Sequence, residues 1–270
     1  MIENKLWIFG DSFSVIDMND RPEKNWTFIL AKKLNYQLHN YSIAGISQDY
    51  TFRCVQHFRN EITENDQIII LLTERARFFF SEDHVHITNA WLTDLPKYLP
   101  QNIGQAAAAF FKHIQRPTLD HQWETQRLGW LNNLVRIKKF KKPLVLFGFD
   151  RDVQNLESDY DNLIFSDDYL FNVSEKEFVK RDSRMELFDV SEPRNCHLCY
   201  SNHTVLAEKI FLHLDSNKSF SLKNDFFEAI INEESLTNKE FIEDEFSSVA
   251  FKTFMENTKN KKKYANINIR

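Results

Sequence analysis

Glycine and cysteine are scarce in this sequence. Its 270 residues include five glycines, six prolines and three cysteines. The five glycines stand singly, so the Gly-rich loops that hold nucleotide phosphates are missing. A small, odd number of cysteines in a chain of this length makes no disulfide framework. We therefore expect a protein that binds no nucleotide cofactor and is made in a reducing compartment.

Long apolar segments and net positive charge are also missing. No apolar run approaches the roughly 20 residues needed to span a bilayer. A strand expected from about residue 5 leaves no room for a signal peptide. The net charge is −5, whereas nucleic-acid binding needs clustered lysine and arginine. The basic runs at 136–142 and 259–263 are typical of a solvated face and a tail. We expect a cytoplasmic protein whose partners include neither a membrane nor a nucleic acid.

What the chain does contain is an alternation of short apolar runs with helical periodicities. Hydrophobic residues make up 42% and charged residues 27%, which is typical of a globular protein. The patterns predict strands at 6–9, 36–41, 67–73, 143–150 and 184–190, and helices at 25–34, 48–58, 126–137 and 203–214. Strands that alternate with helices favour parallel pairing and right-handed crossovers. We predict an α/β fold, a three-layer α/β/α sandwich around a mostly parallel sheet of about five strands.

The chain divides where its composition changes. Residues 1–214 carry the strands and helices of the predicted sandwich, with residues 81–140 as an insertion around a crossover helix. That insertion would also form a wall beside a site. Residues 215–270 have scattered phenylalanines, many acids and a basic, Asn-rich end. We predict a C-terminal helical extension there that ends in a frayed tail.

The first strand ends abruptly in Gly10-Asp11-Ser12. In open α/β sheets, ligands bind just beyond the carboxyl ends of the strands. A serine at this position faces that crevice and lies near backbone N–H groups that can hold an oxyanion. Ser12 is therefore a candidate nucleophile, with Asp11 beside it as a candidate binding residue. The same residues also suit an ordinary strand-to-helix turn, because turns are rich in Gly, Asp and Ser.

Two other groups of residues suggest metal or redox chemistry. Cys196 and Cys199 have C-x-x-C spacing, but a structural zinc usually has four ligands and Cys54 is the only other cysteine. A redox pair would follow an early strand in a thioredoxin-like context, which is absent. His84 and His86 alternate as metal ligands can, yet no third ligand is identifiable. The sequence thus predicts no metal site.

Three segments follow one another in a distinctive order: Phe9 to Phe13, then Asn40-x-Ser-x-x-Gly45-x-Ser47, then Asn195-Cys-His197-Leu ahead of a helix. Together they resemble the SGNH (GDSL-type) hydrolase family. The resemblance implies a flavodoxin-like SGNH fold. It also implies that Ser12 attacks the substrate, that His197 takes its proton, and that the N–H groups of Ser12 and Gly45 hold the oxyanion. Taken alone, a histidine before a helix is more often a polar loop residue.

The sequence departs from the family pattern at two places. Where the family has Gly-x-Asn-Asp after the third strand, this chain has Leu72-Thr73-Glu74-Arg75. An ionised glutamate cannot donate a hydrogen bond, so Thr73 or Arg75 would stand in as the third oxyanion donor, as in some phage-encoded relatives that this chain resembles. The acid that orients the histidine is replaced by Asn195, whose amide oxygen can orient the ring without supplying charge. Asp189 or Glu192 are substitutes from the preceding loop.

The resemblance implies a serine esterase or carbohydrate O-deacetylase that works through an acyl-serine intermediate. Such an enzyme acts on an ester or an acetylated glycan and needs no metal or nucleotide cofactor. The alternative is a catalytically degenerate SGNH scaffold that serves as a structural or glycan-binding protein, such as a phage particle or tail component. In that case the C-terminal extension would support assembly into a homo-oligomer or a virion.

Overall fold

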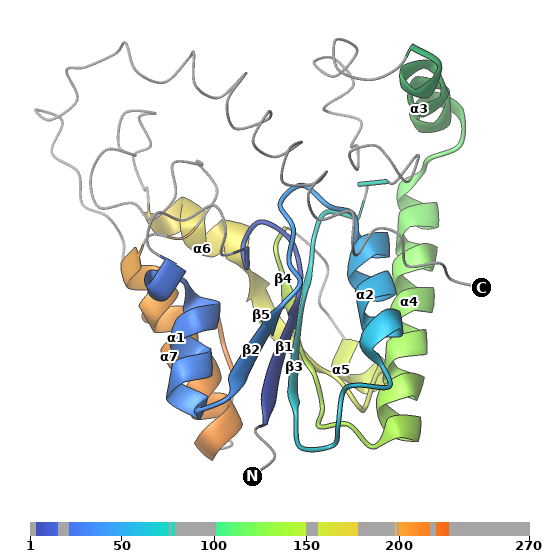
Figure 1. The fold of residues 1–270 in the computed structure, drawn as a ribbon. Coiled ribbons are helices and arrows are strands. Elements are labelled where there is room, and N and C mark those ends of the chain that lie inside the picture. Colours follow the sequence, from blue (N-terminus) through green and yellow to red (C-terminus); the bar gives the residue numbers. More distant parts are fainter. Residues whose placement is uncertain are drawn as a thin grey trace, which may run out of the picture. The chain divides into compact units, whose positions relative to one another are not determined.

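A computed structural model describes residues 4–15, 22–75, 77–78, 101–149, 156–177, 198, 200–216 and 220–226 (Figure 1). The strands are β1 (Lys5–Phe9), β2 (Gln37–Asn40), β3 (Gln67–Leu72), β4 (Leu144–Phe147) and β5 (Ile164–Tyr169). The helices are η1 (Pro22–Lys24), α1 (Trp26–Leu34), α2 (Gln48–Phe58), α3 (Gln101–His113), α4 (Pro117–Lys138), α5 (Leu156–Asp159), α6 (Leu170–Glu177) and α7 (Tyr200–Ser216). Within this part of the chain, no helix combines the length and the apolar character that crossing a bilayer requires.

The strands form one five-stranded sheet in the order β2-β1-β3-β4-β5. β1 pairs in parallel with both β2 and β3, and β3 pairs in parallel with β4. In the register of the central pair, Ile8 lies opposite Ile69. This order is the flavodoxin-like one. The prediction of an α/β fold with a mostly parallel sheet of about five strands is therefore confirmed.

Burial explains why the central strands were recognisable in the sequence. All six residues of β3 and the residues 6–9 of β1 are buried. A strand covered on both faces needs an unbroken apolar run, which is what both segments have. β5 was missed because its sequence, Ile-Phe-Ser-Asp-Asp-Tyr, is half polar. The segment 184–190, where the fifth strand was predicted, lies outside the described residues.

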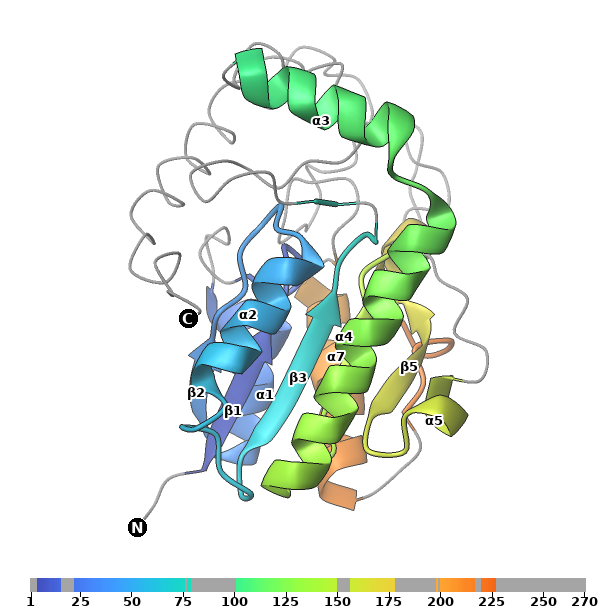
Figure 2. The same cartoon turned by 90° about the vertical axis from the view of Figure 1, so that its right-hand side faces the viewer.

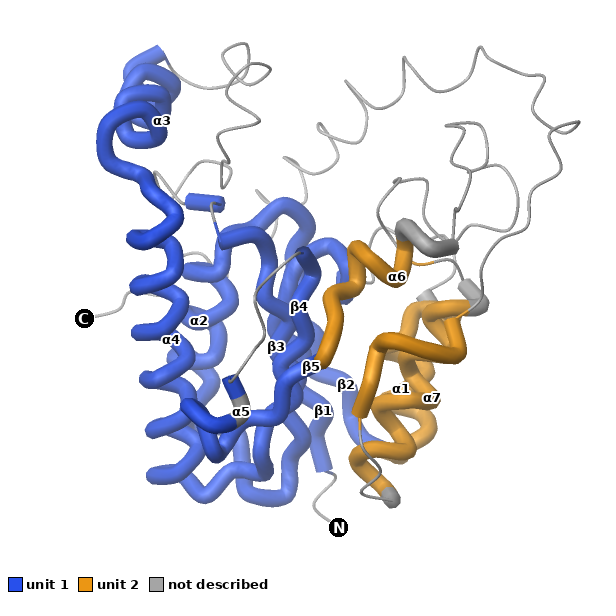
Figure 3. The backbone as a smooth tube through the Cα atoms, turned by 180° about the vertical axis from the view of Figure 1, so that it is seen from behind, with its two compact units in different colours: residues 1–15, 36–166 blue, residues 16–35, 167–270 orange. Residues whose placement is uncertain are grey.

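The chain splits into two compact units, which Figure 3 colours separately. Unit 1 contains Met1–Val15 and Tyr36–Ser166, and unit 2 contains Ile16–Asn35 and Asp167–Arg270. The predicted division into a domain 1–214 and an extension 215–270 stays a prediction, since residues 227–270 lie outside the described part.

In unit 1, the helices α2 and α4 lie side by side along one face of the sheet (Figures 1 and 2). α2 packs on β1 and β3, and an ion pair of 2.5 Å between Asp49 and Arg127 joins the two helices. α4 lies in the chain between β3 and β4. Next to α2, the rings of Trp7, Tyr41 and Phe58 contact one another with centroid distances of 4.2–6.0 Å. These contacts fix α2 against the sheet.

In unit 2, α1 packs against α7. The Asn25 side chain caps α1 by accepting a hydrogen bond from the Thr27 N–H at 3.0 Å, which confirms the predicted N-cap. His203 of α7 is buried, and its Nδ1 accepts a hydrogen bond from the Trp26 N–H at 3.4 Å. Lys33 and Glu208 form an ion pair between the two helices at 2.5 Å. The helix pair is thus joined by a buried and a surface contact.

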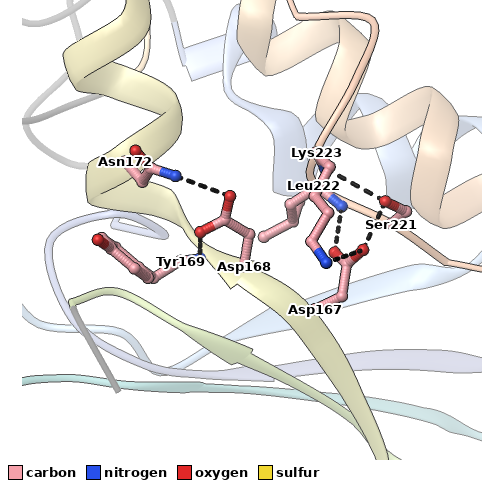
Figure 4. Close-up of polar contacts among 7 residues, drawn as sticks. All are labelled: Asp167, Asp168, Tyr169, Asn172, Ser221, Leu222 and Lys223. Carbon is pink, nitrogen blue, oxygen red and sulfur yellow. Dashed lines mark hydrogen bonds and ion pairs between the residues drawn. The ribbon is translucent and has the colours of Figure 1, made fainter. Parts of the chain in front are cut away.

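In unit 2, β5 also holds the segment 220–226 through hydrogen bonds. Asp167 of β5 accepts hydrogen bonds from the Ser221 hydroxyl at 2.6 Å and the Leu222 N–H at 2.7 Å. The next residue, Asp168, accepts one from the Asn172 amide at 2.7 Å. Figure 4 shows Asp167 directed at the segment 221–223 and Asp168 directed at α6. Successive side chains of a strand point to opposite sides, so neighbouring aspartates hold different elements.

Candidate functional site

The strand order places a topological switch point between β1 and β3. The chain leaves β1 to form β2 on one side, and β3 then lies on the other side of β1. Ligands of doubly wound sheets bind outside the carboxyl ends of the strands at such a point. Ser12 follows β1, Gly45 lies between β2 and α2, and Thr73 and Arg75 follow β3. The structure therefore brings these four predicted site residues to one edge of the sheet.

Ser12 lies in a tight turn that begins directly after β1. The Ser14 N–H donates to the Asp11 carbonyl at 3.1 Å, and the Phe13 N–H donates to the Asp11 carboxylate at 3.1 Å. Asp11 is fully buried, whereas Ser12 is half-buried. The contacts of Asp11 within the turn shape the backbone around Ser12.

Gly10 allows this turn to approach β3. A Cβ atom at position 10 would lie 2.5 Å from the Ser14 hydroxyl oxygen and 2.8 Å from the Leu71 Cβ. Both distances are shorter than van der Waals contact, so only glycine fits here. At position 10, therefore, no side chain separates the carboxyl end of β1 from that of β3.

Hydrogen bonds join the Ser12 turn to the loop after β2. The Asn40 amide donates to the Ser14 carbonyl at 2.7 Å, and its oxygen accepts from the Ser42 N–H at 2.9 Å. The hydroxyl groups of Ser14 and Ser42 are hydrogen-bonded at 2.8 Å. Further along the loop, Gly45 has φ of 73°, a left-handed conformation that favours glycine. The Asn40-x-Ser42 motif thus fixes the loop that presents Gly45.

A buried polar network lies at the carboxyl end of β3. Glu124 of α4 accepts hydrogen bonds from Arg75 Nε at 2.9 Å and from Gln48 Nε2 at 2.8 Å. Gln48 Nε2 also donates to the Thr73 carbonyl at 3.0 Å. The Glu124 side chain is 4% exposed and that of Arg75 is 26% exposed. The network fixes Arg75 at the edge of the sheet while part of its side chain stays accessible.

Arg77 is a buried residue that contacts the same region. Its side chain is buried and donates to the Ile46 carbonyl at 3.2 Å and to the Glu74 carboxylate at 3.3 Å. The guanidinium lies 5.8 Å from the centre of the Phe149 ring, within the range of a cation–π contact. Arg77 therefore connects the end of β3 to the loop next to Gly45.

Burial shifts the pKa of acidic groups on these helices. Burial raises the pKa of Asp120, one turn before Glu124 in α4, although a hydrogen bond from Gln115 and the charge of Arg75 both lower it. Burial raises the pKa of the Cys54 thiol in α2 to about 12, so this cysteine stays protonated at neutral pH. Cys54 thus has the properties of a core residue.

The remaining predicted site residues lie outside the described part of the chain. These are His197 and Asn195, with the substitutes Asp189 and Glu192. The same holds for His84, His86, Cys196 and Cys199. Among the residues that are described, no three histidine, cysteine or acidic side chains come together as metal ligands do.

Sequence reasoning missed Glu124, Gln48 and Arg77. A signal for Glu124 exists: the buried positions of α4 are Asp120, Glu124, Leu128, Leu131 and Val135, so two acids lie on its apolar stripe. Buried acids are uncommon unless they are paired. Gln48 and Arg77 carry no comparable local signal.

Comparisons with known proteins give limited likenesses. No protein-family model matches this chain, and no curated protein matches it. One solved structure that matches is a G-D-S-L family protein, described as lipolytic, from Desulfitobacterium hafniense DCB-2. It is 14% identical with a TM-score of 0.39, and the match covers 76% of this chain and 97% of that one. Another is a family two carbohydrate esterase from Clostridium thermocellum in complex with cellohexaose, which is 11% identical with a TM-score of 0.37, covering 80% and 64%. At these identities and TM-scores, neither likeness assigns a family or an activity to this chain.

Proposed function

We propose that this protein is a serine hydrolase of SGNH type that cleaves carboxylic esters, with O-acetylated carbohydrate as the substrate class. The observation that carries the proposal is the position of Ser12. It lies in a tight turn at the carboxyl end of β1, beside the switch point and hydrogen-bonded through its turn to the loop that presents Gly45. A half-buried serine at this place has the ligand-binding edge of the sheet next to it.

In the proposed reaction, the Ser12 hydroxyl attacks the ester carbonyl while His197 accepts its proton. The oxyanion of the tetrahedral intermediate is held by the N–H groups of Ser12 and Gly45, with Thr73 or Arg75 as the third donor. The C–O bond to the alcohol then breaks, and His197 gives its proton to the leaving oxygen. Asn195 orients the imidazole through its amide oxygen.

The second half of the reaction returns the enzyme to its starting state. Water attacks the acyl carbon as His197 takes a proton from it, and a second tetrahedral intermediate forms in the same oxyanion site. The bond to Ser12 breaks, Ser12 regains its proton from His197, and the acid leaves. None of these steps requires a metal or a nucleotide.

The test is hydrolysis of p-nitrophenyl acetate together with labelling by a fluorophosphonate, which reacts with activated serines. Wild type, Ser12→Ala, His197→Ala and the surface control Ser158→Ala are compared. We expect turnover and labelling in the wild type and in Ser158→Ala, and neither in Ser12→Ala. Labelling of Ser12→Ala to the wild-type extent would place the reactive serine elsewhere. A wild type that neither turns over nor labels would overturn the hydrolase proposal.

The alternative is a degenerate scaffold that binds glycan without cleaving it. The two departures from the family pattern, after β3 and before His197, favour this alternative. Loss of one oxyanion donor costs on the order of 10²–10³ in turnover. Binding of an O-acetylated oligosaccharide, measured by calorimetry without release of acetate, would support the scaffold over the enzyme.

A further inference from the structure

The network around Glu124 joins three elements that are distant in sequence. Gln48 is the first residue of α2, Arg75 follows β3, and Glu124 lies in α4. The Glu124 side chain is almost completely removed from water, at 4% exposure. A buried carboxylate is costly unless it is paired and hydrogen-bonded. Both of its oxygens have a partner here: Oε1 accepts from Arg75 and Oε2 accepts from Gln48.

Only one orientation of the Gln48 side-chain amide suits the two groups that it contacts. The Gln48 amide nitrogen has two hydrogens, and it contacts two acceptors, the Thr73 carbonyl at 3.0 Å and Glu124 Oε2 at 2.8 Å. Neither acceptor can donate while Glu124 is ionised, so the amide nitrogen and not its oxygen must face them. Gln48 thereby fixes the carboxylate of Glu124 to the backbone at the end of β3.

The contact with Arg75 is made through Nε, on one edge of the guanidinium. A guanidinium is planar and rigid, so a hydrogen bond at Nε sets the direction of the whole group. The side chain of Arg75 is 26% exposed, whereas that of Arg77, two residues further on, is 6% exposed. Of these two cations, Arg75 is the one that stays accessible at the edge where Ser12 and Gly45 lie.

We propose that Glu124 is a positioning residue that, together with Gln48, holds Arg75 as the third oxyanion donor of the Ser12 site. This inference rests on the proposed hydrolase function. Arg75 is the residue that would touch the oxyanion, and Glu124 acts through it. The buried carboxylate of Glu124 thus helps to orient Arg75, the donor that this chain has where the family pattern has an asparagine.

Glu124→Gln tests the proposal with little change in shape. A glutamine can accept at its oxygen from Arg75 or from Gln48, but its NH₂ then faces the other donor. The variant therefore breaks one of the two contacts. The matched control is Arg127→Gln, which removes the 2.5 Å ion pair with Asp49 between the same two helices. Both variants weaken the contact of α2 with α4, but only Glu124→Gln disturbs the network that orients Arg75.

Two readouts separate positioning from packing. We expect kcat for p-nitrophenyl acetate to fall about tenfold or more in Glu124→Gln, below the 10²–10³ cost of losing a donor entirely, with KM within about twofold. Arg127→Gln should keep the wild-type kcat. Arg75→Lys, which cannot form the same bond, should also lower kcat. Adding Glu124→Gln to Arg75→Lys should then cost little more, because the two residues act as a unit.

The second readout does not depend on activity. The Arg75 Nε–H should give a side-chain ¹⁵N–¹H signal that exchanges slowly with water, is missing in Arg75→Lys and exchanges faster in Glu124→Gln. A wild type without this signal would overturn the network itself. A wild type that labels with fluorophosphonate while Glu124→Gln keeps full kcat would overturn the positioning role alone. A wild type that does not label overturns the hydrolase proposal, and the positioning role with it.

Discussion

The hydroxyl groups of Ser14 and Ser42 are hydrogen-bonded at 2.8 Å. Both residues are buried, and they join the turn after β1 to the loop after β2. Two serines of one turn therefore have different surroundings: Ser14 is tied into the scaffold, whereas Ser12 is half-buried at the proposed site.

This difference predicts opposite results for two alanine variants. Ser14→Ala removes a buried hydrogen bond and should lower the free energy of unfolding by about 1–3 kcal/mol, because Ser42 loses its partner. It should still be labelled by fluorophosphonate at Ser12. Ser12→Ala should unfold at nearly the wild-type urea concentration without being labelled. If Ser12→Ala proves the less stable of the two, the assignment of structural and reactive serine is reversed.

Gly10 should not tolerate any side chain. Gly10→Ala places a Cβ 2.8 Å from the Leu71 Cβ in the neighbouring strand, and that overlap should cost about 3 kcal/mol, the upper part of the range for overpacking. The control is Gly104→Ala in α3, where a Cβ meets nothing within 4 Å. There alanine should be neutral or stabilise by up to about 1 kcal/mol. Urea unfolding of both variants measures the difference, and equal midpoints would contradict it.

His203 should make stability depend on pH. Burial lowers its folded-state pKa from 6.5 to about 3. Between these values the unfolded chain binds a proton that the folded chain does not, so stability falls as pH falls below 6.5 and levels out near 3. The slope from this group approaches about 1.4 kcal/mol per pH unit.

Urea unfolding of wild type and His203→Asn at several pH values measures that contribution. Asparagine keeps an acceptor for the Trp26 N–H but does not titrate, so its stability should depend less on pH. His121→Asn, at an exposed position of α4, is the control and should follow the wild type. Parallel curves for His203→Asn and wild type would show that the histidine is not responsible.

Asp167 should hold the segment 220–226. Asp167→Ala leaves the buried Leu222 N–H without its 2.7 Å acceptor. Loss of a hydrogen bond to a charged group costs about 1.5–3 kcal/mol, so amide exchange of Leu222 should speed up at least about tenfold. Asp225→Asn is the control, since this side chain is 77% exposed and asparagine also suits the left-handed backbone at φ 72°. Hydrogen exchange followed by NMR compares the two, and an unchanged Leu222 rate in Asp167→Ala would contradict the assignment.

The sequence by itself determined the elements whose signal is local. β1 and β3 were recognisable as apolar runs, and the predicted helix 48–58 coincides with α2, because burial on both faces of a strand or on one face of a helix leaves a periodicity in neighbouring residues. The turn at Ser12 and the loop at Gly45 were also predicted, since Gly, Asp and Ser at a strand end have few other uses. These signals predicted that Ser12 and Gly45 follow two strands of the sheet, and β1 and β2 are neighbours in it.

Only the tertiary structure decided what holds that site together. The sheet order, the use of the half-polar segment 164–169 as β5, and the contacts of Glu124 with Gln48 and Arg75 depend on residues far apart in the chain. A carboxylate in α4 looks the same in the sequence whether it faces water or an arginine. Its partner is selected by how the helices pack on the sheet, and that packing brings residues 48, 75 and 124 within hydrogen-bond distance.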